Sequence, residues 1–295
     1  MKSVLAFLLT VCSLTVFAER QVIVPINYTN EVLSAAAFAG FSYYNPQRGG
    51  KLDNCSGVLV SKIVAEKRRY FMLTVQHHNK APGFEIRKYL VALGVRKLPS
   101  EVRIAFLNPN ELHWCNSDEK FDMSITDITD SYDENAADSD DSQRFVDLES
   151  IGDVFRGDKK GLLKGVGVAR AEDFGKLKIS AGQTVCITGI AAPEFTTNGI
   201  VPFKTTFHGL EALLSNVNTE VEIYNRSNID ETPLKHIVHQ IALPNKDGFS
   251  GGGVYAKLDD GRMFLIGIIT GGGADHCDII PIEHVYDLID SCFKM

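Results

Sequence analysis

Short runs of β-branched and aromatic residues recur along the chain, and turn-forming residues separate them. The runs have the usual length of strands, about 4–8 residues, and Gly, Asn, Asp and Pro lie between them. Few segments show the three-to-four-residue spacing of an amphipathic helix. The pattern therefore predicts an all-β barrel or sandwich. The expected strands span residues 55–61, 69–75, 101–107, 122–128, 183–190, 219–224, 236–243, 252–258 and 263–270.

One segment departs from this pattern, at the end of the chain behind Pro281. Its apolar residues recur every three or four positions, which predicts one amphipathic helix packed on the β-structure. A helix that binds a partner protein is the alternative. The apolar positions are Val285, Leu288, Ile289, Cys292 and Phe293.

The segment 127–150, DITDSYDENAADSDDSQRFVDLES, is rich in Asp and poor in apolar residues. It cannot bury enough apolar surface to order itself, so we expect an exposed linker or insertion. Calcium binding is the alternative, although the glycine and terminal glutamate of an EF-hand loop are missing. We place the boundary between two β domains here, with one domain at 19–145 and the other at 146–295.

The first residues have the pattern of a secretory signal. One positive charge precedes an apolar run from Val4 to Phe17, and small residues suited to cleavage end at Ala18. We therefore expect residues 1–18 to be removed and the protein to be secreted or periplasmic. An N-terminal membrane anchor is the alternative, but the run is short for spanning a bilayer.

The net charge limits the classes of binding partner, and the cysteine content indicates which covalent and metal links to expect. The formal net charge of −7 argues against nucleic acid or an anionic membrane as the main partner. After residue 18 the number of cysteines is odd, so we expect one or two disulfides and at least one remaining thiol, with a connectivity that spacing does not reveal. No CxxC or Cys/His pair indicates structural zinc. These cysteines are Cys55, Cys115, Cys186, Cys277 and Cys292.

The stretch KDGFSGGG, residues 246–253, places Ser250 among glycines in a Gly-x-Ser-x-Gly pattern. The same pattern forms the nucleophile elbow of α/β-hydrolases, whose acid and histidine follow the serine. Only 45 residues follow Ser250, and the alternating βα pattern is absent upstream. An esterase of that class is therefore disfavoured.

Upstream, a histidine and then an aspartate occur at the ends of expected strands, which is the order His77, Asp122, Ser250. These segments resemble the chymotrypsin-like serine proteases, and the likeness covers most of the mature chain. The C-terminal Ile-Pro followed by a helix is similar to bacterial members of the family. The matching segments are CSGVLVS (55–61), LTVQH (73–77), DMSI (122–125), GQTVCITGI (182–190), GFSGG (248–252) and LIGIITGG (265–272).

The resemblance implies two six-stranded antiparallel β-barrels with a C-terminal α-helix, and it implies a role for each residue. Ser250 would be the nucleophile, His77 the base and Asp122 the acid that orients His77. A serine hydroxyl needs such a base, and the base needs a buried carboxylate to set its tautomer. Gly248 and Ser250 would supply the oxyanion-hole N–H groups. The substrate-binding residues would be Pro244, Thr270, Gly271 and Gly272, and no metal or organic cofactor is required.

Two of these assignments have alternatives. His78 could replace His77 as base, and Asp127 could replace Asp122 as acid.

Phe249 stands where trypsin-like zymogens carry the aspartate that pairs with a new N-terminus, so we expect no such activation switch. Pro244 stands where trypsins carry their specificity acid, which favours a medium or large apolar side chain in the substrate.

These inferences predict a secreted serine endopeptidase that acts through an acyl-enzyme. We expect a protein or peptide substrate, a protein inhibitor as a further kind of partner, and a monomer. The alternative function is a pseudoprotease, a secreted binding module that has lost turnover. Phe249, His78 and the acidic segment motivate that alternative.

Overall fold

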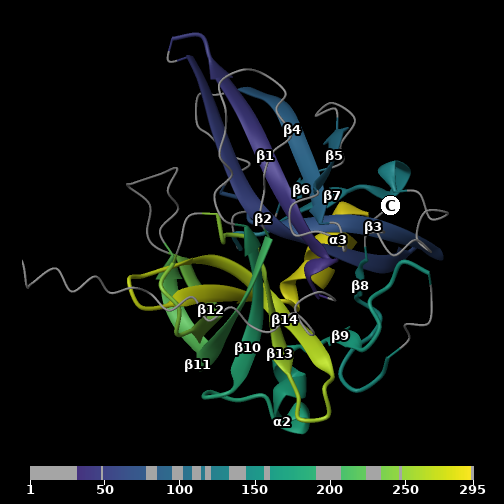
Figure 1. Ribbon diagram of the computed structural model, residues 1–295, viewed down its shortest axis with the longest axis vertical. Coiled ribbons are helices and arrows are strands. Elements are labelled where there is room, and N and C mark those ends of the chain that lie inside the picture. The colour runs from purple at the N-terminus through teal and green to yellow at the C-terminus, as the bar shows by residue number, and fades with distance from the viewer. Residues whose placement is uncertain are drawn as a thin grey trace, which may run out of the picture.

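Two mainly antiparallel sheets, stacked end to end, make up most of the computed structural model (Figure 1). The expected signal, His78 and residues 133–143 of the acidic segment lie outside the residues that the structure describes. The described residues are 32–47, 49–77, 85–94, 102–107, 114–116, 121–132, 144–155, 160–190, 207–223, 234–245 and 248–293.

The first sheet holds eight strands of the described chain, in the order β5-β4-β1-β2-β3-β7-β6, with β8 paired to β2. β8 lies parallel to β2, with Val146 opposite Val60, just after the predicted domain boundary at 145/146. That boundary stays a prediction. The strands are β1 (Ala36–Asn45), β2 (Gly49–Val64), β3 (Lys67–Thr74), β4 (Glu85–Gly94), β5 (Val102–Leu107), β6 (Trp114–Asn116), β7 (Ser124–Asp127) and β8 (Val146–Asp147).

The second sheet closes into a six-stranded antiparallel barrel. Its strands follow the ring β13-β10-β11-β12-β15-β14, the β13–β14 pairing closes that ring, and β9 adds a parallel strand to β14. Gly267 is required in β14 because an added Cβ would lie 2.2 Å from the Ile280 carbonyl oxygen of β15. The strands are β9 (Val166–Val168), β10 (Thr184–Ile190), β11 (Phe207–Ile223), β12 (Leu234–Ile241), β13 (Gly253–Lys257), β14 (Met263–Gly272) and β15 (Cys277–Pro281).

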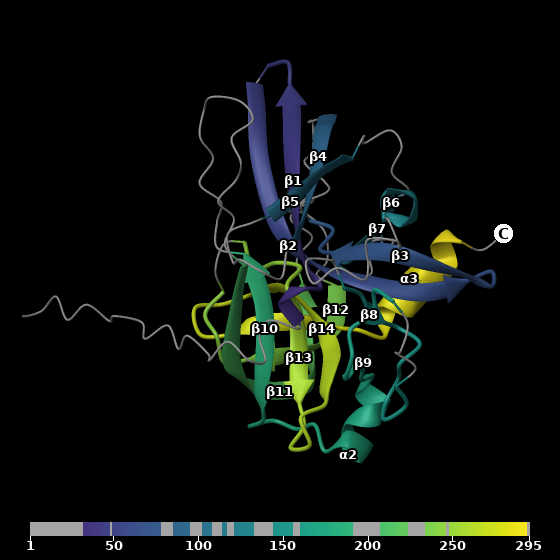
Figure 2. The same cartoon turned by 45° about the vertical axis from the view of Figure 1, so that its right-hand side comes forward.

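Helix α3 (His284–Cys292) follows the second barrel but packs against the first sheet (Figure 2). Val285, Leu288 and Ile289 are buried, as the apolar spacing predicted. Among the described residues, further helical elements include the short α2 (Phe174–Leu177) and the 3-10 turns η1 (Thr129–Ser131) and η3 (Ala171–Asp173). The predicted fold class, all-β with a C-terminal helix, is confirmed. None of the helices in the described chain is long and apolar enough to cross a membrane.

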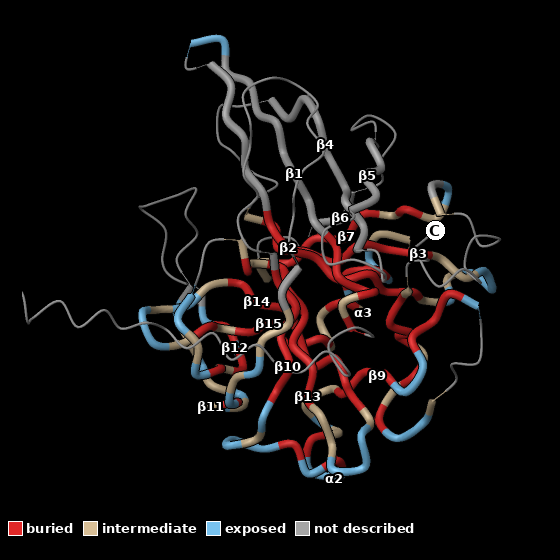
Figure 3. Tube along the Cα trace, viewed as in Figure 1, coloured by how far each residue is buried: buried red, intermediate tan, exposed pale blue. Residues whose placement is uncertain are grey.

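The buried apolar side chains form two groups (Figure 3). One fills the second barrel and includes Val185, Ile187 and Ile266. The other joins the first sheet to the outer side of the second barrel and to α3, and includes Leu73 and Ile268. The two sheets therefore share a continuous apolar junction, and at this junction residues of one sheet can contact residues of the other.

Candidate active site

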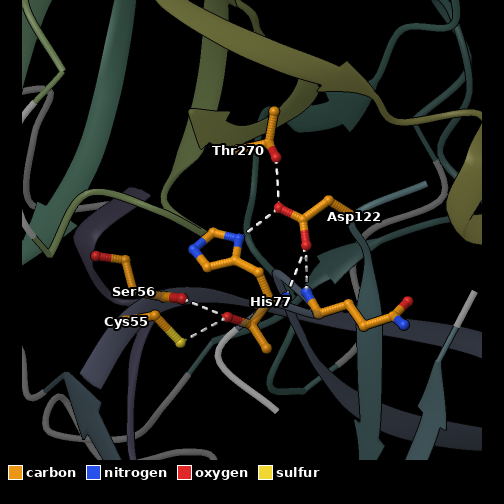
Figure 4. Close-up of polar contacts among 7 residues, drawn as sticks. Cys55, Ser56, His77, Asp122 and Thr270 are labelled. Atoms are coloured by element: carbon orange, nitrogen blue, oxygen red, sulfur yellow. Dashed lines mark hydrogen bonds and ion pairs between the residues drawn. The ribbon is translucent and has the colours of Figure 1, made fainter. Parts of the chain in front are cut away.

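His77 and Asp122 lie side by side because β3 and β7 are neighbours in the first sheet. The strands pair antiparallel with Thr74 opposite Ser124, so the residues just after β3 and just before β7 meet. The His77 Nδ1 and Asp122 Oδ2 atoms are 2.5 Å apart (Figure 4). The other carboxylate oxygen, Oδ1, accepts the backbone N–H groups of Gln76 at 3.0 Å and His77 at 2.7 Å.

The second barrel also holds this carboxylate. The Thr270 hydroxyl, near the end of β14, donates to Asp122 Oδ2 at 2.5 Å (Figure 4). Because an ionised carboxylate only accepts, its contact with Nδ1 requires the proton of a neutral His77 to sit on Nδ1. That tautomer makes Nε2 the basic nitrogen of the ring.

The loop that carries Ser250 is fastened to β2. The Ser56 N–H donates to the Ser250 carbonyl at 2.8 Å, and the Ser56 hydroxyl donates to the Gly248 carbonyl at 2.5 Å. Gly251 has φ +87°, and an added Cβ would lie 2.0 Å from the Ser56 carbonyl oxygen. Only glycine has both the backbone freedom and the small size that this close approach requires.

Phe249 faces the interior of the second barrel and is 5% exposed. It fills the space beside Gly189, where an added Cβ would lie 2.0 Å from the Phe249 ring. The residue before Ser250 is thus a core side chain. Its burial anchors the loop to the core of the second barrel.

The structure brings some of the predicted residues together and leaves others apart. Within the described chain, no hydrogen bond joins the His77 ring to the Ser250 hydroxyl, and no protein group accepts the backbone N–H of Gly248 or Ser250. Pro244 is exposed, and its neighbour Asn245 donates its N–H to the Gly273 carbonyl at 3.2 Å.

Asp127, the alternative to Asp122 as the acid, has a different environment. Its Oδ1 accepts the Thr129 N–H at 3.0 Å and the Thr129 hydroxyl at 2.5 Å, and its Oδ2 pairs with Arg69. These contacts lie beside the start of η1, at the end of β7 farther from Asp122. Asp122, not Asp127, is therefore the carboxylate beside the His77 ring.

Two histidines lie near Asp122 without adding charge to it at neutral pH. The Phe121 ring stacks on His284 with centroids 3.6 Å apart and meets His236 edge-on at 5.7 Å. Burial lowers the pKa of His236 and of His284, so both rings are neutral at pH 7. In the part of the chain that the structure describes, no cluster of three or more His, Cys, Asp or Glu side chains could hold a metal ion.

Thr270 and Ser56 have contacts that the sequence did not predict. Thr270 was expected only to line the substrate site, and Ser56 was not singled out. The sequence around a hydroxyl residue in an apolar strand does not reveal which distant residue its hydroxyl will contact, because that depends on the register of the strands. The apolar flanks of Thr270 could at most have indicated a buried polar residue in need of a hydrogen bond.

No protein-family model and no curated protein sequence matches the chain. Among solved structures, it is similar to the active form of the Rv3671c protease from M. tuberculosis, with 14% identity, a TM-score of 0.48 and coverage of 90% of this chain and 86% of that one. An inactive serine-to-alanine mutant of that protein gives 12% identity, a TM-score of 0.47 and coverage of 91% and 94%. The HtrA-type protease AlgW with a tripeptide gives 17% identity, a TM-score of 0.45 and coverage of 91% and 64%. The description of the fold above rests on the strand order of this chain and not on these similarities.

Proposed function

We propose that the chain is a serine endopeptidase in which Ser250, His77 and Asp122 act together. The observation that carries the proposal is the set of donors around Asp122. This carboxylate contacts the His77 ring, the His77 backbone and the Thr270 hydroxyl, and so ties an imidazole to both sheets. A half-buried carboxylate that contacts an imidazole in this way, together with a glycine-rich serine loop, provides the groups for acyl transfer.

In the proposed reaction, the Ser250 hydroxyl oxygen attacks the scissile carbonyl carbon while His77 Nε2 takes the hydroxyl proton. Asp122 stabilises the imidazolium through Nδ1–H and stays ionised. The negative oxygen of the tetrahedral intermediate accepts the N–H groups of Gly248 and Ser250. Each such donor contributes about 3–4 kcal/mol to the transition state.

Collapse of the intermediate breaks the peptide C–N bond, and His77 returns its proton to the leaving amine. Ser250 is then acylated. Water, deprotonated by His77, attacks the ester and releases the second product with Ser250 as a free hydroxyl. Each proton taken by His77 is returned within its own half-reaction, and no metal or organic cofactor takes part.

The substrate would bind along the end of β14. Thr270, Gly271 and Gly272 lie at the strand end nearest the serine loop, and an added Cβ at Gly271 would meet no atom within 4 Å. An extended peptide can pair with such a backbone edge. Together with Pro244, these residues favour medium or large apolar substrate side chains, and we propose that the enzyme acts as a secreted or periplasmic monomer that a protein inhibitor could block.

The direct test is labelling with a serine-directed fluorophosphonate. We expect one covalent adduct on the Ser250 peptide, and no adduct on the Ser250→Ala or His77→Ala variants. A Ser291→Ala variant is the matched control, because the Ser291 hydroxyl donates to the Leu288 carbonyl within α3 and has no proposed role in the site. Labelling that survives Ser250→Ala would remove the proposal.

A pseudoprotease is the second candidate, and one observation favours it. Among the contacts of the described residues, the His77 ring and the Ser250 hydroxyl are not hydrogen-bonded. Catalytic hydrogen bonds often lengthen in the absence of substrate, so this geometry alone does not decide between the two. A correctly folded protein that binds a partner, takes no fluorophosphonate and cleaves no peptide in a broad library would establish the second candidate.

A further inference from the structure

Helix α3 links the end of the chain to the strands that flank Asp122. It contacts both β6 and β7, and its buried side chains belong to the apolar group of the first sheet. Polar contacts fasten it as well, because the Tyr286 hydroxyl donates to the Leu148 carbonyl at 2.7 Å and Lys62 pairs with Asp290. Helix α3 thus lies against the β6–β7 hairpin, and Asp122 lies in the connection of that hairpin.

Cys292 ends this helix, and its sulfur is disulfide-bonded. The three other cysteines whose side chains are described do not provide its partner. Cys186 and Cys277 are buried thiols, and the Cys277 thiol donates to the Leu243 carbonyl at 3.1 Å. Cys55 is a buried thiol 3.1 Å from the Thr74 hydroxyl.

Two cysteines remain, Cys12 and Cys115. Cys12 belongs to the expected signal, which would be removed on secretion. Cys115 is the central residue of β6, the short strand that α3 contacts, and it is paired in register with Ile125 of β7.

We propose that Cys292 is bonded to Cys115, so that a disulfide fastens α3 to the β6–β7 hairpin around Asp122. The bond joins the two sides of a loop of about 177 residues, which contains the whole second barrel. It ties the last turn of the chain to the first sheet, so the second barrel is held to that sheet at both of its ends. This inference does not depend on the proposed peptidase activity.

The chemistry of the other thiols agrees with this pairing. Disulfide exchange needs a thiolate. Burial raises the pKa of Cys186 to about 12, and burial with the nearby Asp278 charge raises the pKa of Cys277 to about 12. Both stay protonated at neutral pH and do not compete. In the forming step, the two thiols of Cys115 and Cys292 lose two protons and two electrons to a disulfide oxidant such as oxidised glutathione, which leaves as two thiols.

The test is a disulfide map of the full chain, made by a secretory host in the Ser250→Ala form so that any self-cleavage is absent. The protein is denatured with iodoacetamide and no reductant, and is then digested with trypsin and an Asp-N protease. The second protease is needed because trypsin alone leaves Cys277 and Cys292 in one peptide, whereas Asp278, Asp287 and Asp290 lie between them. We expect the peptide that begins at Asp290 to be linked to the peptide that contains Cys115, and the pair to separate on reduction.

Alkylation of both Cys115 and Cys292 in the unreduced protein would overturn the proposal. A link from Cys292 to any other cysteine, or to a second chain, would overturn it equally. Because this readout uses the native cysteines, it does not require a cysteine variant to fold.

A stability measurement adds a second readout. Closing a loop of this length is expected to raise the melting temperature by roughly 5–15 °C. We therefore expect a reductant to lower the melting temperature by that amount in the Ser250→Ala protein and in a Cys186→Ser control, and to have no effect in Cys115→Ser or Cys292→Ser. An equal response to reductant in all four proteins would contradict the assignment.

Discussion

Replacing Thr270 by valine removes the hydrogen bond from the second barrel to Asp122 while nearly conserving the volume of the side chain. Thr270 is 7% exposed, and its hydroxyl lies 2.5 Å from Asp122 Oδ2, the oxygen that also contacts His77 Nδ1. The variant therefore changes the position and charge stabilisation of Asp122 and leaves the proposed nucleophile and base in place. Thr270 acts through Asp122, so it is a positioning residue.

The expected magnitude follows from the kind of bond that is lost. A hydrogen bond to a charged group contributes about 1.5–3 kcal/mol. Asp122 keeps two backbone donors, from Gln76 and His77, so the loss is expected in the lower half of that range. Since each 1.4 kcal/mol is a factor of ten in rate, we expect kcat to fall by roughly ten- to fortyfold with KM nearly unchanged.

The assay is steady-state hydrolysis of a fluorogenic peptide chosen from a library screen, with the melting temperature of each variant recorded beside it. Thr270→Ser keeps the hydroxyl and is expected to retain most of the activity. A Thr270→Val variant within twofold of the original kcat would refute the reasoning. So would an equal loss in Thr270→Ser, because that result would assign the effect to packing.

Three further outcomes are expected. Asp122→Asn should lower kcat by about 10⁴-fold with little change in KM, because the neutral amide favours the wrong tautomer of His77; a loss below tenfold in the same peptide assay would count against the triad. Gly251→Ala should destabilise the fold by more than 2 kcal/mol in urea unfolding, because a Cβ would lie 2.0 Å from the Ser56 carbonyl oxygen at φ +87°; a change below 0.5 kcal/mol would mean that the loop does not approach β2 this closely. Burial lowers the pKa of His239 in the folded protein to about 4, whereas in the unfolded chain its pKa is about 6.5. The unfolded chain therefore binds a proton more readily than the folded protein between these two values. As pH falls from 6.5 to 4, the protonation of His239 should lower the free energy of unfolding by about 3 kcal/mol. The His239→Asn variant does not titrate in this range and can still accept the Asn218 N–H. Between pH 7 and pH 4.5, its free energy of urea unfolding should therefore fall less than that of the unaltered protein. An equal fall in both proteins would contradict the prediction.

Much of the fold was accessible from local patterns. Runs of β-branched and aromatic residues predicted many of the strands, although not β1, β4 or β15, and three-to-four spacing predicted α3, because side-chain periodicity reflects which face of an element is buried. The closed six-stranded ring of the second barrel matches the predicted architecture. Its closure through β13 and β14 could not be read from periodicity alone, since two sheets with the same strand pattern can stay open.

The sequence by itself determined the candidate residues and their order, because Ser250, His77 and Asp122 each lie beside a recognisable strand or glycine-rich turn. The tertiary structure decided which groups meet. Pairing of β3 with β7 selected Asp122 over Asp127, and the junction of the two sheets brought Thr270 to that carboxylate. The physical reason is range: periodicity and turn chemistry act over a few residues, whereas a hydrogen bond between residues 122 and 270 depends on how whole sheets pack.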